Sequence, residues 1–230
     1  MNAASVSGTL DSVDKAGRDK ETAYVKIIKG VEQRRDIEKC LITIEARNSS
    51  DPRKAGKLAS YITNQSVVSP STTATGDGSN VSDLAGTNAA MSLAKIDAAM
   101  KAAYSDGGQP DMMVVSPTNK VVFSDLNSGS AVTNQLHMTS PKDATIIGSV
   151  SMYLTDFGLL NVTIDRFNED DRVWLLDSDY YSIGHLPGRM FAVDEVAATG
   201  DASKFVVLSE WTLIMKAPKA HAAIIDLNGA

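Results

Sequence analysis

The side chains that could carry chemistry are few and lie far apart in the chain. The three histidines are His137, His185 and His221, and no two of them have the spacing of a metal-binding pair. Glu169-Asp170-Asp171 is a carboxylate run that could bind Ca²⁺ or Mg²⁺, but no EF-hand pattern surrounds it, so a solvated turn is favoured. The nucleophile motif Gly-x-Ser-x-Gly is absent. The sequence therefore predicts no catalytic residue, no metal site and no cofactor.

Two short motifs are similar to enzyme loops, but both are more typical of turns. Asp156-Phe157-Gly158 matches the metal-binding turn of protein kinases, yet the other kinase motifs are missing, so a hairpin turn is favoured. Gly76-Asp77-Gly78 has no Gly-Lys-Ser/Thr after it and no strand before it. A flexible loop is therefore favoured over a phosphate-binding loop.

Three further features have a structural interpretation. Arg34-Arg35 lies among acidic residues, which favours an ion pair or a subunit contact over a nucleic-acid site. Cys40 is the single cysteine, so it forms no internal disulfide and is expected to be a small buried side chain. Four aromatic residues are expected in a core or an interface: Trp174, Tyr180, Tyr181 and Phe191.

The composition is that of an ordinary globular protein. The chain has 230 residues, of which 43% are hydrophobic and 22% charged, enough for a sizeable core. Its net charge of -6 argues against a dedicated nucleic-acid binder, because phosphate contacts need a basic face. There is no signal peptide and no apolar run long enough to span a membrane.

The first element expected is a long helix over residues 18–47. Its apolar residues follow three-and-four spacing, and charges of alternating sign lie between them, which predicts one packed face and one solvated face. Gly30 lies in the middle, where close packing against a neighbour would explain it. The apolar residues of the expected packed face are Ala23, Ile27, Ile37, Leu41 and Ile44, flanked by Tyr24, Ile28 and Val31.

The middle of the chain is predicted to alternate helices with one strand. A short helix over 53–62 precedes a long Ser/Thr/Gly-rich loop over 64–85. Thr87 is the expected N-cap of a helix over 88–104. A buried strand at 112–115 and a helix over 118–126 follow.

The last third of the chain is rich in strand signals. Residues alternate between apolar and polar over 146–154 and again over 160–164, which predicts a hairpin. Further strands are expected at 172–176, at 205–215 as one long strand, and at 222–227.

Several segments, in this order, resemble the major head (capsid) proteins of tailed phages, which have the Hong Kong 97-type fold. The similar segments are 30–38, 53–59 with 61–64, 106–111 with 115–120, 153–158 with 165–167, and 186–187 with 199–201, 210–213 and 218–221. The resemblance extends over about residues 5–228.

The resemblance implies an α+β fold with a long spine helix, a peripheral-domain (P-domain) sheet and an axial-domain (A-domain) mixed sheet with flanking helices. Residues 1–85 would hold the spine helix, part of the P domain and a flexible loop. Residues 86–200 would form the A domain, and 201–230 would return as long strands to the P domain, making one intertwined unit.

The implied function is structural: self-assembly into the icosahedral head that encloses phage DNA. The implied partners are copies of itself, in pentamers and hexamers, and a scaffold, portal or decoration protein, with no membrane and no sequence-specific nucleic acid. The implied location is the virion, and the host cytoplasm before assembly. The resemblance brings no catalytic residue.

One departure concerns the start of the chain. The family has an N-terminal arm and an extended (E) loop before the segment that begins at Val6. Both reach across neighbouring subunits, so their absence here predicts a truncated, assembly-deficient and largely monomeric form.

Two alternative functions remain. An encapsulin-like shell that holds enzymes would have the same fold, and a cargo-peptide groove or the neighbouring genes would identify it. A small hydrolase or metal enzyme would need His137 or His185 beside two carboxylates in one pocket.

Overall fold

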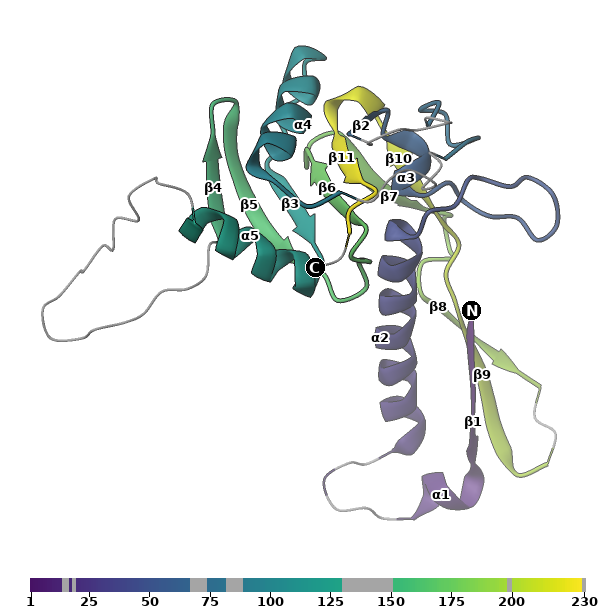
Figure 1. Ribbon diagram of the computed structural model, residues 1–230. Helices are drawn as coiled ribbons and strands as arrows, with labels where there is room; N and C mark the ends of the chain where they lie inside the picture. Colours follow the sequence, from purple (N-terminus) through teal and green to yellow (C-terminus); the bar gives the residue numbers. More distant parts are fainter. Residues whose placement is uncertain are drawn as a thin grey trace, which may run out of the picture. The chain divides into compact units, whose positions relative to one another are not determined.

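The computed structural model of the chain (Figure 1) describes residues 1–13, 17, 20–66, 74–81, 89–129, 151–197 and 200–228. The helices are α1 (Gly8–Ser12), α2 (Glu21–Ile42), α3 (Leu58–Tyr61), α4 (Leu93–Ser105), α5 (Pro117–Gly129) and the 3₁₀ helix η1 (Pro218–Ala220). The first six strands are β1 (Asn2–Ser7), β2 (Asn64–Ser66), β3 (Met112–Val115), β4 (Met152–Thr155), β5 (Gly158–Ile164) and β6 (Arg172–Leu176). The remaining strands are β7 (Tyr181–His185), β8 (Ala192–Val196), β9 (Ala202–Leu208), β10 (Trp211–Met215) and β11 (Ala222–Ile225).

The chain divides into two compact units. Unit 1 contains residues 1–41 and 182–214, and unit 2 contains residues 42–181 and 215–230. These boundaries differ from the predicted ones at 85/86 and 200/201. The assignment of the segments to a peripheral and an axial domain stays a prediction.

Unit 2 is built on a six-stranded mixed sheet with the order β2-β11-β6-β3-β5-β4. Strand β3 is parallel to β5 and antiparallel to β6, and Met113 lies opposite both Val162 and Leu175. Strand β6 consists of five buried residues, as expected of a strand covered on both faces. The predicted strands at 112–115 and 172–176 are therefore confirmed.

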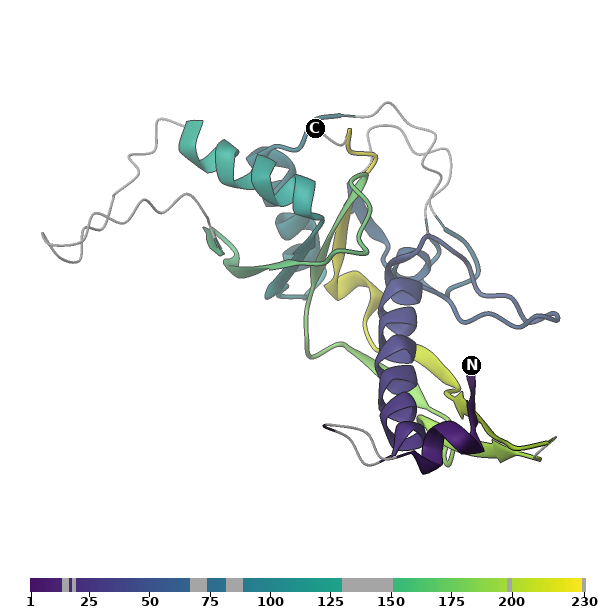
Figure 2. The same cartoon turned by 90° about the horizontal axis from the view of Figure 1, so that it is seen from below.

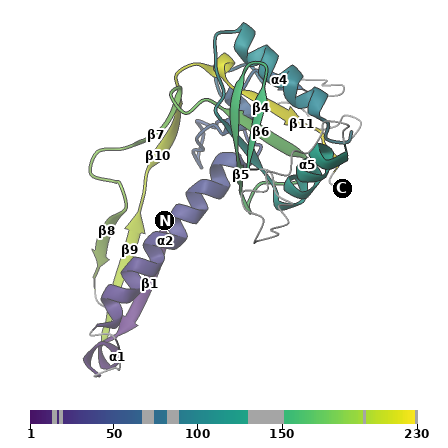
Figure 3. The ribbon, with the colours of Figure 1, turned by 90° about the vertical axis from the view of Figure 1, so that its left-hand side faces the viewer.

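Helices α4 and α5 lie on the same face of this sheet (Figure 3). The apolar residues of α4 recur at three-and-four spacing, which places them on one side of the helix. Phe123 of α5 packs edge-on against Tyr153, with ring centroids 5.8 Å apart. The helix residues buried in this core are Ile96, Ala99, Met100, Ala103 and Phe123.

Unit 1 is a two-layer structure of one long helix and a three-stranded sheet. The sheet has the order β1-β9-β8, and both strand pairs are antiparallel. Val6, Phe205 and Val207 form its small core with Val25 of α2, and the Lys26 ammonium lies 5.3 Å from the centre of the Phe205 ring. Figures 2 and 3 show α2 running beside these strands. Strands β7 and β10 pair as a separate two-stranded ribbon.

The long helix was predicted correctly in kind, but its packed face was only partly predicted. Ile27 is 68% exposed, and Tyr24 and Val31 are also exposed. Gln33 is 3% exposed and Ile37 8% exposed, so these residues lie on the packed face. The unit's own sheet packs against the side of α2 that holds Val25 and Lys26, and spacing alone does not specify which side is covered.

Other expectations about elements needed correction. The helix predicted over 88–104 is α4, which begins at Leu93. Its N-cap is Ser92, whose Oγ accepts a hydrogen bond from Lys95 N at 3.4 Å. Thr87, the expected cap, lies outside the described residues. The single strand expected over 205–215 is two strands, because 209–210 leave the ladder: Glu210 N donates to Arg189 O at 3.1 Å. Cys40 is half-buried rather than buried.

Candidate functional site

The imidazole of His221 is the least exposed titratable group among the described residues of unit 2. It is fully buried, and its Nδ1 accepts a hydrogen bond from the backbone nitrogen of Asp177 at 3.1 Å. The Tyr181 ring lies edge-on to it at 6.0 Å. Burial lowers the pKa of His221, while the nearby Asp177 carboxylate opposes that shift. Because Nδ1 accepts a hydrogen bond, the proton of the neutral ring lies on Nε2.

The turn that presents the Asp177 amide is held by two carboxylates. Asp177 accepts from Gln109 N at 3.0 Å and from Asp179 N at 3.1 Å. Asp111 accepts from both the backbone nitrogen and the hydroxyl of Ser178, each at 2.9 Å. These bonds tie the β6–β7 turn to the segment that precedes β3. The carboxylates of this cluster thus have structural partners and do not contact the imidazole by hydrogen bonds.

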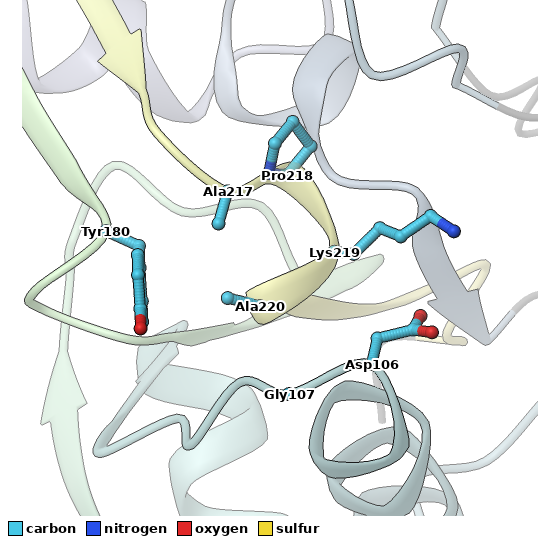
Figure 4. A pocket seen from close by; sticks show the side chains of 7 residues that line it. All are labelled: Asp106, Gly107, Tyr180, Ala217, Pro218, Lys219 and Ala220. Carbon is cyan, nitrogen blue, oxygen red and sulfur yellow. The ribbon is translucent and has the colours of Figure 1, made fainter.

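An open pocket of about 380 Å³ lies next to this cluster (Figure 4). Its lining residues are Asp106, Gly107, Tyr180, Ala217, Pro218, Lys219 and Ala220. The Tyr180 ring faces Ala217 and Ala220, and Asp106 lies at the other end. Asn64 donates to the Asp106 carboxylate at 3.1 Å and to the Lys219 carbonyl at 2.7 Å. The walls suit a small apolar group, and the lining holds no nucleophile with a base beside it.

The carboxylate run is a salt-bridge site for a buried arginine. Arg172 is 3% exposed, and its guanidinium pairs with the carboxylates of Glu169 and Asp171. It also donates to the carbonyl of Ile42, the last residue of α2, at 3.2 Å. Among the described residues, no group of three or more metal-ligating side chains of the His, Cys, Asp and Glu types is found. Two of the three carboxylates therefore neutralise Arg172, which gives the run a structural role.

The two enzyme-like motifs are turns in the structure. Asp156-Phe157-Gly158 connects β4 to β5, and the Thr155 hydroxyl donates to Gly158 O at 2.8 Å, so the hairpin prediction is confirmed. Asp77 accepts hydrogen bonds from Thr75 and Ser79. The Ser79 hydroxyl is the largest cause that lowers the Asp77 pKa well below its usual range. Asp77 thus organises a turn of its own chain.

The other sequence candidates do not come together in one site. His185 lies 3.4 Å from the Ser209 hydroxyl and its ring is 5.8 Å from that of Phe191, while His137 lies outside the described residues. The Arg34 guanidinium lies 5.4 Å from the Phe191 ring. Trp174 is fully buried in unit 2, with its indole nitrogen donating to Asn168, so the core prediction holds for it.

Large apolar side chains are exposed on both units, and the sequence did not indicate this. On the β4–β5 hairpin, Leu154 is 76% exposed, Met152 54% and Leu159 43%. Leu154 lies opposite Leu159 across the ladder, so these side chains share the sheet face turned away from Tyr153 and Leu160. Alternation predicted a two-faced strand, but it did not predict that the outer face is also apolar. Such patches are typical of contact surfaces.

In the part of the chain that the structure describes, no helix has the length and apolar character needed to cross a bilayer. No curated protein sequence matches this one.

Solved structures with a similar fold are phage and encapsulin shell proteins. A chain of the cyanophage A-1(L) capsid asymmetric unit gives a TM-score of 0.67 at 12% identity, over 98% of this chain and 76% of that one. The holo-SrpI encapsulin complex from Synechococcus elongatus PCC 7942 gives 0.60 at 12% identity, over 100% and 73%. A structure of phage G gp27 major capsid proteins and gp26 decoration proteins gives 0.54 at 9% identity, over 99% and 70%.

These similarities confirm the α+β fold of the Hong Kong 97 type. The sequence itself matches the model of one family, described as SU10 major capsid protein, over residues 1–228. The chain therefore belongs to the SU10 major capsid protein family.

Proposed function

We propose that this chain forms the wall of a phage head by repeated contacts with copies of itself, in rings of five and six, around DNA. As a major capsid protein it is a component of the virion. The observation that carries the proposal is the set of large apolar side chains exposed on both units, such as Ile27 and Leu154. A shell protein needs several such faces, because a closed assembly requires more than one kind of self-contact.

The proposed role is structural and not catalytic. A hydrolase would need a histidine beside carboxylates in a pocket. In the described part of the chain, the His185 ring hydrogen-bonds with the Ser209 hydroxyl, and the His221 ring with the backbone amide of Asp177. The Asp177 carboxylate, near His221, accepts hydrogen bonds from the backbone nitrogens of Gln109 and Asp179. This arrangement supports a stabilising role for these polar groups.

The two compact units have different proposed positions in the shell. We assign unit 2, with its six-stranded mixed sheet, to the axial domain that surrounds each ring centre. Unit 1, with α2 and the strands β8 and β9, is assigned to the peripheral domain that meets neighbouring rings. Support for this assignment comes from the separation of the two cores, which lets each unit present its own surface.

Additional partners are proposed by analogy of fold. The phage G structure contains decoration proteins beside the major capsid proteins. A decoration protein is therefore a proposed partner of this chain, together with a scaffold and a portal protein. An encapsulin-like compartment is the second candidate, favoured only by the fold it shares with the SrpI complex. DNA inside purified particles would support the phage head, and enzyme cargo would support the compartment.

The composition of purified virions tests the proposed function. We expect peptides of this chain to be the most abundant protein component of the head when virions are digested and analysed by mass spectrometry. Their absence from virions that contain another abundant shell protein would contradict the proposal.

A further inference from the structure

The solvent-exposed side of α2 carries a regular stripe of six residues. They recur at spacings of four, three, four, three and four, and all six are exposed: Lys20, Tyr24, Ile27, Val31, Arg34 and Glu38. Lys20 directly precedes the helix and continues its spacing. The mean spacing, 18 residues over five steps, is about 3.6 residues, close to the 3.5 of the seam along which two helices pack. Over the 18 residues from Lys20 to Glu38 the stripe is about 27 Å long.

The stripe lies outside the buried core of unit 1, and of its six residues Arg34 contacts the Phe191 ring. The opposite side of α2 packs on the three-stranded sheet, where Lys26 lies over Phe205, and Gln33 and Ile37 are buried. The centre of the stripe is nevertheless the most apolar part of the helix surface, because Ile27 is 68% exposed and Val31 47%. The polar residue Gln33 is buried, while the β-branched apolar residues Ile27 and Val31 are exposed. This exposed apolar surface is available for a contact with a second molecule.

The order of residues along the stripe makes it complementary to its own reverse. Residues at equal distances from position 29 pair as Ile27 with Val31, Tyr24 with Arg34, and Lys20 with Glu38. Two antiparallel copies would therefore match apolar with apolar at the centre, aromatic with guanidinium further out, and ammonium with carboxylate at each end. A two-fold axis makes every pair twice.

We propose that α2 of one copy packs antiparallel against α2 of a second copy through this stripe, across a two-fold axis. This inference rests on the proposed function, since it takes the chain to assemble with itself. Charge decides the orientation: in a parallel pair with the helices in register, Lys20 would face Lys20 and Arg34 would face Arg34, which like-charge repulsion disfavours. In the antiparallel pair, Lys20 faces Glu38 and Arg34 faces Tyr24, so no like charges meet.

The surroundings of Arg34 favour the same arrangement. Its guanidinium lies 5.4 Å from the Phe191 ring of its own chain, yet the residue is exposed. A planar guanidinium has two faces, so Tyr24 of a second copy can stack on the face that Phe191 leaves uncovered. The Arg34–Phe191 contact then holds the guanidinium in position before the second copy arrives.

Site-specific disulfide formation tests the register. In a Cys40→Ser background, a tagged Ile27→Cys chain is mixed with an untagged Val31→Cys chain under mild oxidation. We expect a tagged–untagged dimer in several times the yield given by the control mixture of Asp36→Cys with Val31→Cys. Asp36 is also exposed but lies on another side of α2. Equal yields from the two mixtures would overturn the proposal.

Charge exchange tests the orientation on the same chains. Lys20→Glu alone and Glu38→Lys alone should each lower the disulfide yield, and the double variant should restore it. A double variant whose yield falls as far as both losses combined would overturn the antiparallel pairing. All of these residues are exposed, so thermal unfolding should be unchanged, which verifies that the variants fold. Virion composition is measured independently, so failure of this helix contact leaves the proposed capsid function standing.

Discussion

The fully buried imidazole of His221 accepts, through Nδ1, a hydrogen bond from the backbone nitrogen of Asp177 at 3.1 Å. A nitrogen that accepts a hydrogen bond from an amide cannot itself carry a proton. Protonation of the ring would therefore break this bond and place a positive charge in the interior. His221 follows η1 and precedes β11, so this contact joins the last strand of the sheet to the end of β6.

The neutral ring predicts that unit 2 loses stability in mild acid. Burial lowers the pKa of His221 in the folded chain below 6.5, the value of the unfolded chain. As pH falls below 6.5, the unfolded chain binds a proton that the folded chain does not, so the free energy of unfolding decreases. The slope from one such group is at most about 1.4 kcal/mol per pH unit. Urea unfolding between neutral pH and mildly acidic pH measures it.

Two histidine variants separate this effect from general acid sensitivity. His221→Asn removes the titrating ring, and we expect the stability of this variant to depend less on pH over this range. His185→Asn should leave the slope unchanged, because His185 is only half-buried and lies in unit 1. An unchanged slope in the His221 variant would show that other groups cause the acid sensitivity.

Gly30 predicts a stabilising substitution. A Cβ placed on Gly30 would have no heavy atom within 4 Å, although the glycine lies in the interior of α2. Gly30→Ala should therefore raise the free energy of unfolding by about 1 kcal/mol, the difference in helix propensity. Thermal unfolding of the two proteins at one pH measures the change.

Gly108 provides a control in which alanine should change the free energy of unfolding in the opposite direction. A Cβ there would lie 2.3 Å from Ala220 Cα, a backbone atom that has no rotamer to change. Gly108→Ala should lower the free energy of unfolding by roughly 1–3 kcal/mol, as overpacking does. If both alanines destabilise the chain, α2 packs at Gly30 in a way that the structure does not show.

The long helix illustrates what spacing can and cannot predict. The pattern of apolar residues correctly indicated a helix, because helical periodicity is a local property. It placed Ile27 on the packed face, but Ile27 is exposed and the sheet of unit 1 packs against the side with Val25 and Lys26. The covering sheet is built from β1, β8 and β9, which lie at opposite ends of the sequence. The choice between the two faces is therefore a long-range property.

The same distinction holds for the remaining elements and for the site. The hairpin at Asp156-Phe157-Gly158 was predictable, since a turn forms among neighbouring residues. The break between β9 and β10 was not, because Glu210 binds the backbone of Arg189. The contact of His221 with Asp177 spans 44 residues, and no spacing rule points to it. Local patterns did not predict the overall fold. That prediction came from the resemblance to phage head proteins.

Arg172 is expected to be the residue of unit 2 least tolerant of neutralisation. Its guanidinium is buried between the Asp171 carboxylate and the Ile42 carbonyl. Arg172→Met should lower the free energy of unfolding by roughly 3 kcal/mol, because a carboxylate and a carbonyl lose their partner. Chemical denaturation measures this loss. The control is Arg166→Met, an exposed site where a change within about 0.5 kcal/mol is expected. Similar losses in both variants would contradict the role of burial.

Two leucines of the β4–β5 hairpin allow the effect of a substitution on stability to be measured separately from its effect on assembly. Leu160 is fully buried in the core of unit 2, whereas Leu154 is 76% exposed on the opposite face. Leu160→Ala should cost about 2–5 kcal/mol of unfolding free energy, since it removes buried methyl groups and leaves a cavity. Leu154→Lys should change that free energy by less than about 0.5 kcal/mol, because the side chain already lies in solvent.

The same two variants should lower the titre of a phage that carries them for different reasons. Leu154→Lys places a charge on the apolar face shared with Met152 and Leu159, so we expect a folded protein but a sharply reduced titre of infectious particles. Leu160→Ala should reduce the titre only as far as the folded protein becomes scarce, and growth at lower temperature should recover part of it. A normal titre for Leu154→Lys would mean that this face stays in solvent in the assembled head. The contacts between copies would then have to be made by other surfaces, such as the stripe on α2.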